Sequence, residues 1–368
     1  MKRIMIIFLV CIMLAGACTH VVSARLSQMK EEHEKNEYVK ECVIKREEER
    51  KVSQQSDEKK KKEEAELKEY KDQQIKNCLP GIVCWGDNMT AGVGGNGVSY
   101  PSILRELICQ DIYDIPVLNM GISGESSLTI SARAGSIDFL IDGVTIPATN
   151  TPVEIKFKEY NNYEIAPLRQ GNTGINPVTI NGIKGTLNIK QENNYDGEYQ
   201  YFFTRTLLGE ETIITDGSKL SIASEGLYND YIPVIYIGQH GGFDDTKDLI
   251  NQINAIINVH TQQKKYIVLG LTTGTKESRK ELEEAMQNAF GDRYINLREI
   301  LCENGLSDCN MEPTEEDLEY IKIGSIPPSL LADDRYFNSY GYIEIANIIY
   351  ERMQMLGYFD DVLNILSE

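Results

Sequence analysis

An apolar run that ends in a turn of small residues constrains this chain more than any other stretch. Residues 82–85 read Ile-Val-Cys-Trp, 86–88 read Gly-Asp-Asn, and a small-residue loop follows to Gly97. A helical pattern begins near Ser99, so the stretch predicts a buried strand, a sharp turn and a helix. Open α/β sheets bind their ligands at the carboxyl ends of strands. Asn88 is therefore predicted to lie at the mouth of a site.

Strand and helix patterns alternate through much of the remaining chain. Apolar strand-like runs recur at 116–120, 231–237, 266–269 and 294–297, with helical patterns between them. This alternation predicts an α/β fold with a doubly wound, mostly parallel sheet. Between 136 and 230 the pattern changes to period two and is punctuated by Gly, Asn and Pro, which predicts a β-rich insertion. A structural appendage is its default interpretation, and shaping a substrate site or binding sugar is the functional one.

The amino terminus predicts export. Basic residues at 2–3 precede the apolar run 4–14, which is short for a bilayer span and typical of a secretory signal peptide. Residues 14–18 resemble a bacterial lipobox, which would make Cys18 the lipidated first residue of a membrane-anchored lipoprotein. Ordinary cleavage after 22–24, giving an extracellular protein, is the alternative.

A charged segment without glycine or proline follows the leader. Residues 25–78 hold 15 basic and 15 acidic residues, with Glu and Lys often four apart. Apolar residues are sparse and keep no sustained heptad, so a single exposed helix or a weak coiled coil is predicted. Such a helix could act as a spacer at a membrane and allow self-association, whereas a partly disordered linker is the alternative.

The resulting organisation has four parts. They are a signal peptide (1–24), a charged helical spacer (25–78), an α/β domain in two pieces (79–135 and 231–368) and the β-rich insertion (136–230).

Charge and residue usage exclude several classes of function. The net charge is −19, and because 25–78 is neutral the acidic excess lies in the folded part. Nucleic-acid binding needs clustered Lys and Arg, so no nucleic-acid partner is expected. The sequence has no Cys-x-x-Cys pair, and Asp87 and Asp333 lack an evident third ligand. We therefore expect no metal and no cofactor.

Four short motifs, in order, resemble the blocks of the SGNH (GDSL) hydrolases, which are serine esterases. Gly-Asp-Asn-Met at 86–89 stands where that family has Gly-Asp-Ser-Leu, and the glycine-rich run 121–127 matches its second block. Gly-Gln-His at 238–240 matches Gly-x-Asn, and 333–342 matches the block that carries the catalytic Asp and His. The resemblance implies a flavodoxin-like sheet and ester hydrolysis, often of acyl or acetyl groups on carbohydrate.

The same resemblance assigns roles to five positions, three of them substituted. Asn88 stands at the nucleophile, Gly124 and His240 at the oxyanion donors, Asp333 at the triad acid and Tyr336 at the base. An amide has no usable nucleophilic lone pair, and a phenol that titrates near pH 10 cannot accept a proton as imidazole does. The substitutions predict a domain that has lost ester hydrolysis and binds a glycan or an acylated ligand.

Two other functions remain open. An active esterase or deacetylase could pair His240 with Ser123, Ser126 or Ser127, although serines in such loops usually cap helices. A purely structural surface protein is the third reading. Asp87 is a candidate for ligand binding. So is Arg133, which could hold an anionic group or form a structural ion pair.

Overall fold

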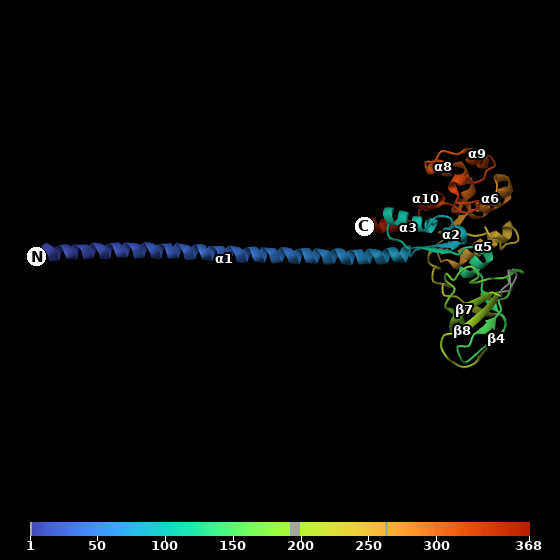
Figure 1. Ribbon diagram of the computed structural model, residues 1–368, viewed down its shortest axis with the longest axis horizontal. Helices are drawn as coiled ribbons and strands as arrows, with labels where there is room; N and C mark the ends of the chain where they lie inside the picture. The colour runs from blue at the N-terminus through green and yellow to red at the C-terminus, as the bar shows by residue number, and fades with distance from the viewer. Residues whose placement is uncertain (1, 192–198, 262–263) are drawn as a thin grey trace. The chain divides into compact units, whose positions relative to one another are not determined.

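The computed structural model describes residues 2–191, 199–261 and 264–368, and the chain divides into two units, 1–72 and 73–368 (Figure 1). The first unit is formed by most of helix α1 (Lys2–Cys78), whose side chains are exposed along nearly its whole length. The helix runs without a break through the predicted leader and spacer. The Lys59–Glu63 and Lys62–Glu66 ion pairs lie on its surface at 3.6 and 3.8 Å, each with the lysine four residues before the glutamate.

The amino-terminal part of α1 is longer and more apolar than the run 4–14 suggested. An 18-residue window there has a mean hydropathy of 2.5, and α1 is the one helix of the described residues long and apolar enough to cross a membrane. A signal sequence passes the same test of length and composition. By length and composition, the amino-terminal part of α1 is therefore compatible with a signal sequence or with a membrane anchor.

A five-stranded parallel sheet organises the second unit. Its order is β13-β12-β11-β1-β2, and neighbouring strands pair in parallel. The strands are β1 (Ile82–Gly86), β2 (Val117–Gly121), β11 (Ile232–Tyr236), β12 (Ile267–Leu269) and β13 (Tyr294–Ile295). Counted along the chain, this is the 2-1-3-4-5 order of flavodoxin-like sheets, with its switch point between β1 and β11. The predicted α/β class with a parallel sheet is confirmed.

Helices cover both faces of this sheet, because successive residues of a strand point to opposite faces. All five residues of β1 are buried. Ile82 and Cys84 belong to one core cluster, which includes residues of α3 (Tyr100–Asp111) and α10 (Ser339–Met355). Val83 and Trp85 belong to another, with residues of α4 (Ser127–Arg133), α5 (Thr246–Val259) and α6 (Lys276–Phe290). This two-sided burial explains the continuous apolar pattern of β1.

The domain boundary lies earlier than the sequence suggested. Ile75, in the last turn of α1, is 3% exposed, and Leu79 just after it is 2% exposed, both in the core cluster of α3 and α10. The last turn of α1 thus belongs to the second unit. Further short elements are α2 (Asn88–Ala91), α7 (Leu297–Glu303), α8 (Gly305–Asp308), α9 (Glu315–Lys322), α11 (Asp360–Ser367) and the 3-10 turns Gly291–Arg293 and Pro328–Leu330.

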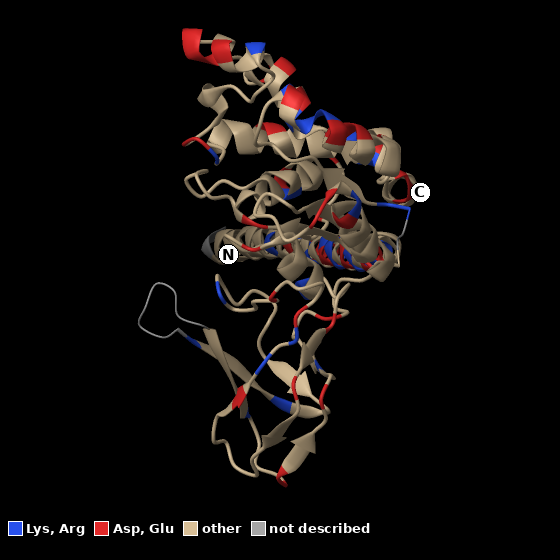
Figure 2. Cartoon of the chain, turned by 90° about the vertical axis from the view of Figure 1, so that its right-hand side faces the viewer, with Lys and Arg blue, Asp and Glu red and all other residues tan. Residues whose placement is uncertain are grey.

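The described residues of 136–230 form β-structure (Figure 2), and its core cluster also includes Leu128 and Ala132 of α4. Six strands pair antiparallel in the order β3-β10-β6-β7-β8-β5, and β4 pairs with β9. The strands are β3 (Phe139–Ile141), β4 (Val144–Ile146), β5 (Val153–Ile155), β6 (Val178–Ile180), β7 (Ile183–Gln191), β8 (Tyr199–Arg205), β9 (Thr212–Ile214) and β10 (Ser218–Ser221). Alternating burial along β8 matches the period-two pattern read from the sequence.

Candidate functional site

Three loops meet where β1, β2 and β11 end. The turn 86–88 follows β1, the loop 122–126 follows β2, and the loop 238–242 follows β11. Strand β1 pairs with both β2 and β11, so its carboxyl end lies between the other two. This is the switch point of the sheet, where doubly wound folds bind their ligands. The motifs singled out at Asn88, Gly124 and His240 therefore lie at one edge of one sheet.

The side chain of Asn88 is bonded to the loop after β2. The backbone N–H of Gly124 donates to Asn88 Oδ1 at 2.5 Å, and Asn88 is only 7% exposed. Gly124 has φ +78°, a left-handed backbone conformation that residues other than glycine rarely adopt. The N–H of Gly124, which by the resemblance would stabilise an oxyanion, thus donates to the amide oxygen of Asn88 instead.

Asp87 is fully buried and only half satisfied. It caps α2, with Oδ1 accepting the N–H of Met89 at 3.1 Å. Its Oδ2 is buried without a hydrogen-bond partner. Burial, with a smaller contribution from the charge of Glu125, raises the pKa of Asp87 to about 7. This carboxyl group therefore titrates near neutral pH.

His240 faces Asp87 across the switch point. Its Nε2 lies 3.9 Å from Asp87 Oδ2, beyond hydrogen-bonding distance, and its side chain is 29% exposed. Burial, and after it the charge of Arg335, lowers the pKa of His240. Glycines at 238, 241 and 242 all have positive φ, which lets the chain turn tightly around this histidine.

Asp333 is occupied by the main chain of its own turn. It is exposed, and its Oδ1 accepts the N–H groups of Arg335 and Tyr336 at 2.9 and 2.8 Å. These two bonds lower the pKa of Asp333. The half-buried ring of Tyr336 packs against the core cluster of α3 and α10. In this structure Asp333 shapes the turn, a role different from the predicted triad acid, and Tyr336 contributes to packing.

The serines considered as relocated nucleophiles have structural roles where their bonds are seen. Ser126 caps α4 by accepting the N–H of Thr129 at 3.4 Å, as serines in such loops usually do. Ser127 is fully buried; its main-chain N–H donates to Gly241 O at 2.9 Å, and its hydroxyl has no hydrogen-bond partner in the described part of the chain. Ser123 is half-buried in the loop after β2.

Arg133 lies inside the protein, so the structural interpretation replaces the predicted ligand-binding role. Its side chain is 0% exposed, and Nε donates to Glu125 Oε2 at 2.7 Å. Nη2 donates to Met120 O at 2.8 Å, and the guanidinium lies 5.7 Å from the Trp85 ring centre. Arg133 thus fixes the loop that carries Gly124. Glu125 was not predicted from the sequence, where its only signal is its place in that glycine-rich loop.

A small cavity with a mixed polar and apolar lining lies beyond the end of β12. It has a volume of about 110 Å³, and its lining includes Thr272, Ser325, Arg335, Leu331 and Phe337. Whole ligands need about 300 Å³ or more. The cavity is therefore sized for one small chemical group, and sequence motifs gave no sign of it.

Gln239 links this cavity to the loop of His240. Its Nε2 donates to Thr272 Oγ1 at 2.8 Å, and its Oε1 accepts from Thr273 Oγ1 at 3.2 Å. Arg279 holds the other side of the loop, donating to Thr273 O and Oγ1. The loops after β11 and β12 are thus tied together by side chains.

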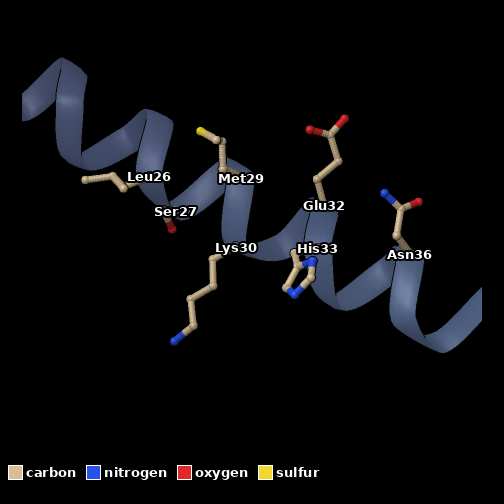
Figure 3. A pocket seen from close by; sticks show the side chains of 7 residues that line it. All are labelled: Leu26, Ser27, Met29, Lys30, Glu32, His33 and Asn36. Carbon is tan, nitrogen blue, oxygen red and sulfur yellow. The ribbon is translucent and has the colours of Figure 1, made fainter.

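The described residues add no metal centre, and the surface of α1 offers no enclosed site. No three His, Cys, Asp or Glu side chains in the described ranges are placed to hold a metal. Figure 3 shows a shallow depression on α1 between Leu26 and Asn36, whose side chains project from a single helix without a second element to close it. Cys18 is exposed on the same helix.

Comparisons with solved structures include a distant likeness. No family model matches the sequence, and no curated protein matches it. A solved structure described as a peptidoglycan O-acetylesterase is 11% identical, with a TM-score of 0.31, over 75% of this chain and 90% of that one. At this identity and TM-score the likeness does not bear on the activity of this chain.

Proposed function

We propose that this chain is an exported, membrane-anchored surface protein whose α/β domain binds a glycan or an acylated ligand without hydrolysing it. The observation that carries the proposal is the hydrogen bond from Gly124 N–H to Asn88 Oδ1. An acyl-transfer site needs a nucleophile and a free N–H donor for the developing oxyanion. Here Asn88 stands in place of a nucleophile, and its oxygen also accepts the N–H of Gly124 that an oxyanion would need.

The remaining groups at the switch point suit binding better than acyl transfer. Asp333 is engaged by two backbone N–H groups, and Tyr336 packs against the core. The cavity of about 110 Å³ is lined by polar side chains, Ser325 and Arg335 among them, and by apolar ones such as Leu331. Such a lining can hydrogen-bond an acetyl, acetamido or hydroxymethyl group of a sugar. This supports a carbohydrate-like ligand of which one substituent enters the cavity.

The test is hydrolysis of a small aryl acetate by the purified full chain in detergent. We expect no turnover above buffer from the natural protein. The matched variant Asn88→Ser, Tyr336→His, His240→Asn restores the residue types that the resemblance assigns to nucleophile, base and donor. We expect measurable turnover from this variant, because removing nucleophile or base alone costs on the order of 10⁴ to 10⁶ in rate.

Two outcomes would contradict the proposal. Hydrolysis by the natural protein, with labelling by a serine-reactive phosphonate, would establish an active esterase or deacetylase, and the labelled residue would be its nucleophile. Absence of binding to glycan arrays bearing acetylated and de-acetylated sugars would remove the binding function and leave a structural surface protein.

A further inference from the structure

We propose that Asp87 and His240 form a latch that ties the turn after β1 to the loop after β11 when the two side chains together hold one proton. The two side chains face each other across the switch point of the sheet, with His240 Nε2 3.9 Å from Asp87 Oδ2. The latch does not depend on whether the domain binds or cleaves its ligand.

The carboxyl group of Asp87 is held in place through one oxygen, and the other oxygen has no hydrogen-bond partner. Oδ1 is fixed by the N–H of Met89, and the residue is 0% exposed. Oδ2 is buried and has no hydrogen-bond partner. A buried oxygen without a partner is costly, so a donor that reaches it stabilises the protein. His240 Nε2 stands at 3.9 Å, about 1 Å beyond the length of a charge-assisted hydrogen bond.

The His240 side is a mobile side chain between tethered neighbours. Gln239 donates to Thr272 Oγ1 at 2.8 Å, and Gly241 O accepts the N–H of Ser127 at 2.9 Å. The backbone on both sides of His240 is therefore fixed, while the ring itself is 29% exposed. A shift of about 1 Å lies within the reach of a side-chain rotation. Closure thus needs no hinge in the loop.

Charges on the elements packed around the pair keep it open and neutral. Arg335, in the turn before α10, opposes an imidazolium at His240. Glu125, in the loop before α4, opposes a carboxylate at Asp87, although its own ion pair with Arg133 reduces this effect.

Two phenols complete this environment. Tyr236 of β11 and Tyr342 of α10 are electrostatically coupled to Asp87, and burial raises the pKa of both phenols well above neutrality. They therefore stay uncharged across the range in which the pair titrates. The balance of the latch is set by Asp87, His240, Glu125 and Arg335.

The proton count predicts a maximum of closure near neutral pH. In the open form Asp87 is protonated below about pH 7, and His240 is neutral above its lowered pKa. The closed form holds a charged imidazolium against a carboxylate, so on closing the proton moves from Asp87 Oδ2 to His240 Nε2. Above the pKa of Asp87 the open pair holds no proton, and below the lowered pKa of His240 it holds two. Closure at the higher pH therefore takes up one proton, and closure at the lower pH releases one.

The experiment is an NMR pH titration of the full chain in detergent with ¹⁵N-labelled histidine. His240→Gln identifies the resonance among the four histidines. We expect His240 in the natural protein to stay an imidazolium to a higher pH than its lowered pKa in the open form implies. In Asp87→Asn, which keeps an oxygen to cap Met89 N–H, we expect it to lose its proton about one pH unit or more lower, because the opposite charge is gone.

Controls make each outcome decisive. Asp333→Asn changes an exposed aspartate in the neighbouring turn and should leave the His240 titration unchanged. Arg335→Gln removes a positive charge and should raise the pH at which His240 loses its proton. Equal titration of His240 in the natural protein and in Asp87→Asn would overturn the latch. If Asp87→Asn does not fold, the natural protein decides alone, because a His240 that is neutral at pH 6.5 excludes the charged pair.

Discussion

The amide at position 88 does what neither a serine nor an aliphatic residue would do there. Its oxygen accepts the N–H of Gly124 in a part-buried hydrogen bond that closes off much of the amide from water. A serine oxygen is closer to the backbone and is needed as a nucleophile in the resembling esterases. The asparagine therefore replaces a catalytic contact with a structural one that joins the loops after β1 and β2.

Removal of this contact should weaken the fold. We expect Asn88→Ala to lower the free energy of unfolding by about 1 kcal/mol, because the half-buried N–H of Gly124 loses its partner. Asn119→Ala is the matched control, since the exposed Asn119 also accepts a glycine N–H, that of Gly121, at 2.9 Å. Water can replace that bond, so its loss should matter little. Urea unfolding measures both, and equal losses would contradict a special role for Asn88.

Asp87 should make stability depend on pH. Its pKa of about 7 in the folded protein lies above the ordinary value of about 3.9 in the unfolded chain. The folded state therefore holds the proton more tightly, and stability should fall as pH rises from about 4 to 7, then level off. The linkage amounts to roughly 4 kcal/mol at most.

The variant Asp87→Asn isolates this effect from other titrating groups. It keeps the capping oxygen but removes the proton, so its unfolding free energy should lose less than that of the natural protein between pH 5 and pH 8. Urea unfolding at the two pH values gives the comparison. Parallel losses in the two proteins would show that Asp87 does not titrate in this range.

At the scale of elements, the sequence predicted what depends on local pattern. The parallel strands were placed within about two residues, because β1, β11 and β12 are apolar runs buried on both faces. The insertion was recognised from its period-two pattern, but its strand order was not, since the order depends on non-local pairing. The short helices α7 to α9 carried no strong periodic signal.

The candidate site divides in the same way. The positions of Asn88, Gly124 and His240 follow from strand ends and were predicted. The partners of Asp333 and Arg133 were not, because a carboxylate or guanidinium pairs with whatever the tertiary fold brings near it. Asp333 bonds its own turn and Arg133 bonds Glu125. Sequence spacing alone does not distinguish such pairs from ligand contacts.

The Glu125–Arg133 pair should be decisive for the element that carries Gly124. Both side chains are almost fully buried, so Arg133→Met would strand a carboxylate and lower the free energy of unfolding by about 3–5 kcal/mol. Arg133→Met with Glu125→Gln should recover part of this loss. Arg105→Met breaks the exposed pair with Asp114 and should cost about 1 kcal/mol or less. Equal losses for Arg133→Met and Arg105→Met in chemical denaturation would contradict this role.

At the scale of the whole molecule, the apolar start of α1 and the acidic folded part have different tasks. Unit 73–368 contains the parallel sheet, its site and the β-rich segment, while unit 1–72 is one exposed helix. An apolar window of membrane-spanning length, preceded by two basic residues, favours a membrane-bound amino terminus. Whether the anchor is a lipid or the helix itself then rests on one residue, Cys18.

We expect a lipid on Cys18, because residues 14–18 resemble a lipobox. A bacterial host given a labelled fatty acid should incorporate it into the natural protein and not into Cys18→Ala. Cys11→Ala is the matched control, since Cys11 is exposed in the same apolar run, and it should keep the label. Mass spectrometry of the mature amino terminus completes the test. An intact chain that begins at Met1 without lipid and stays in the membrane fraction would show that α1 itself is the anchor, because its apolar window is long enough to cross a bilayer.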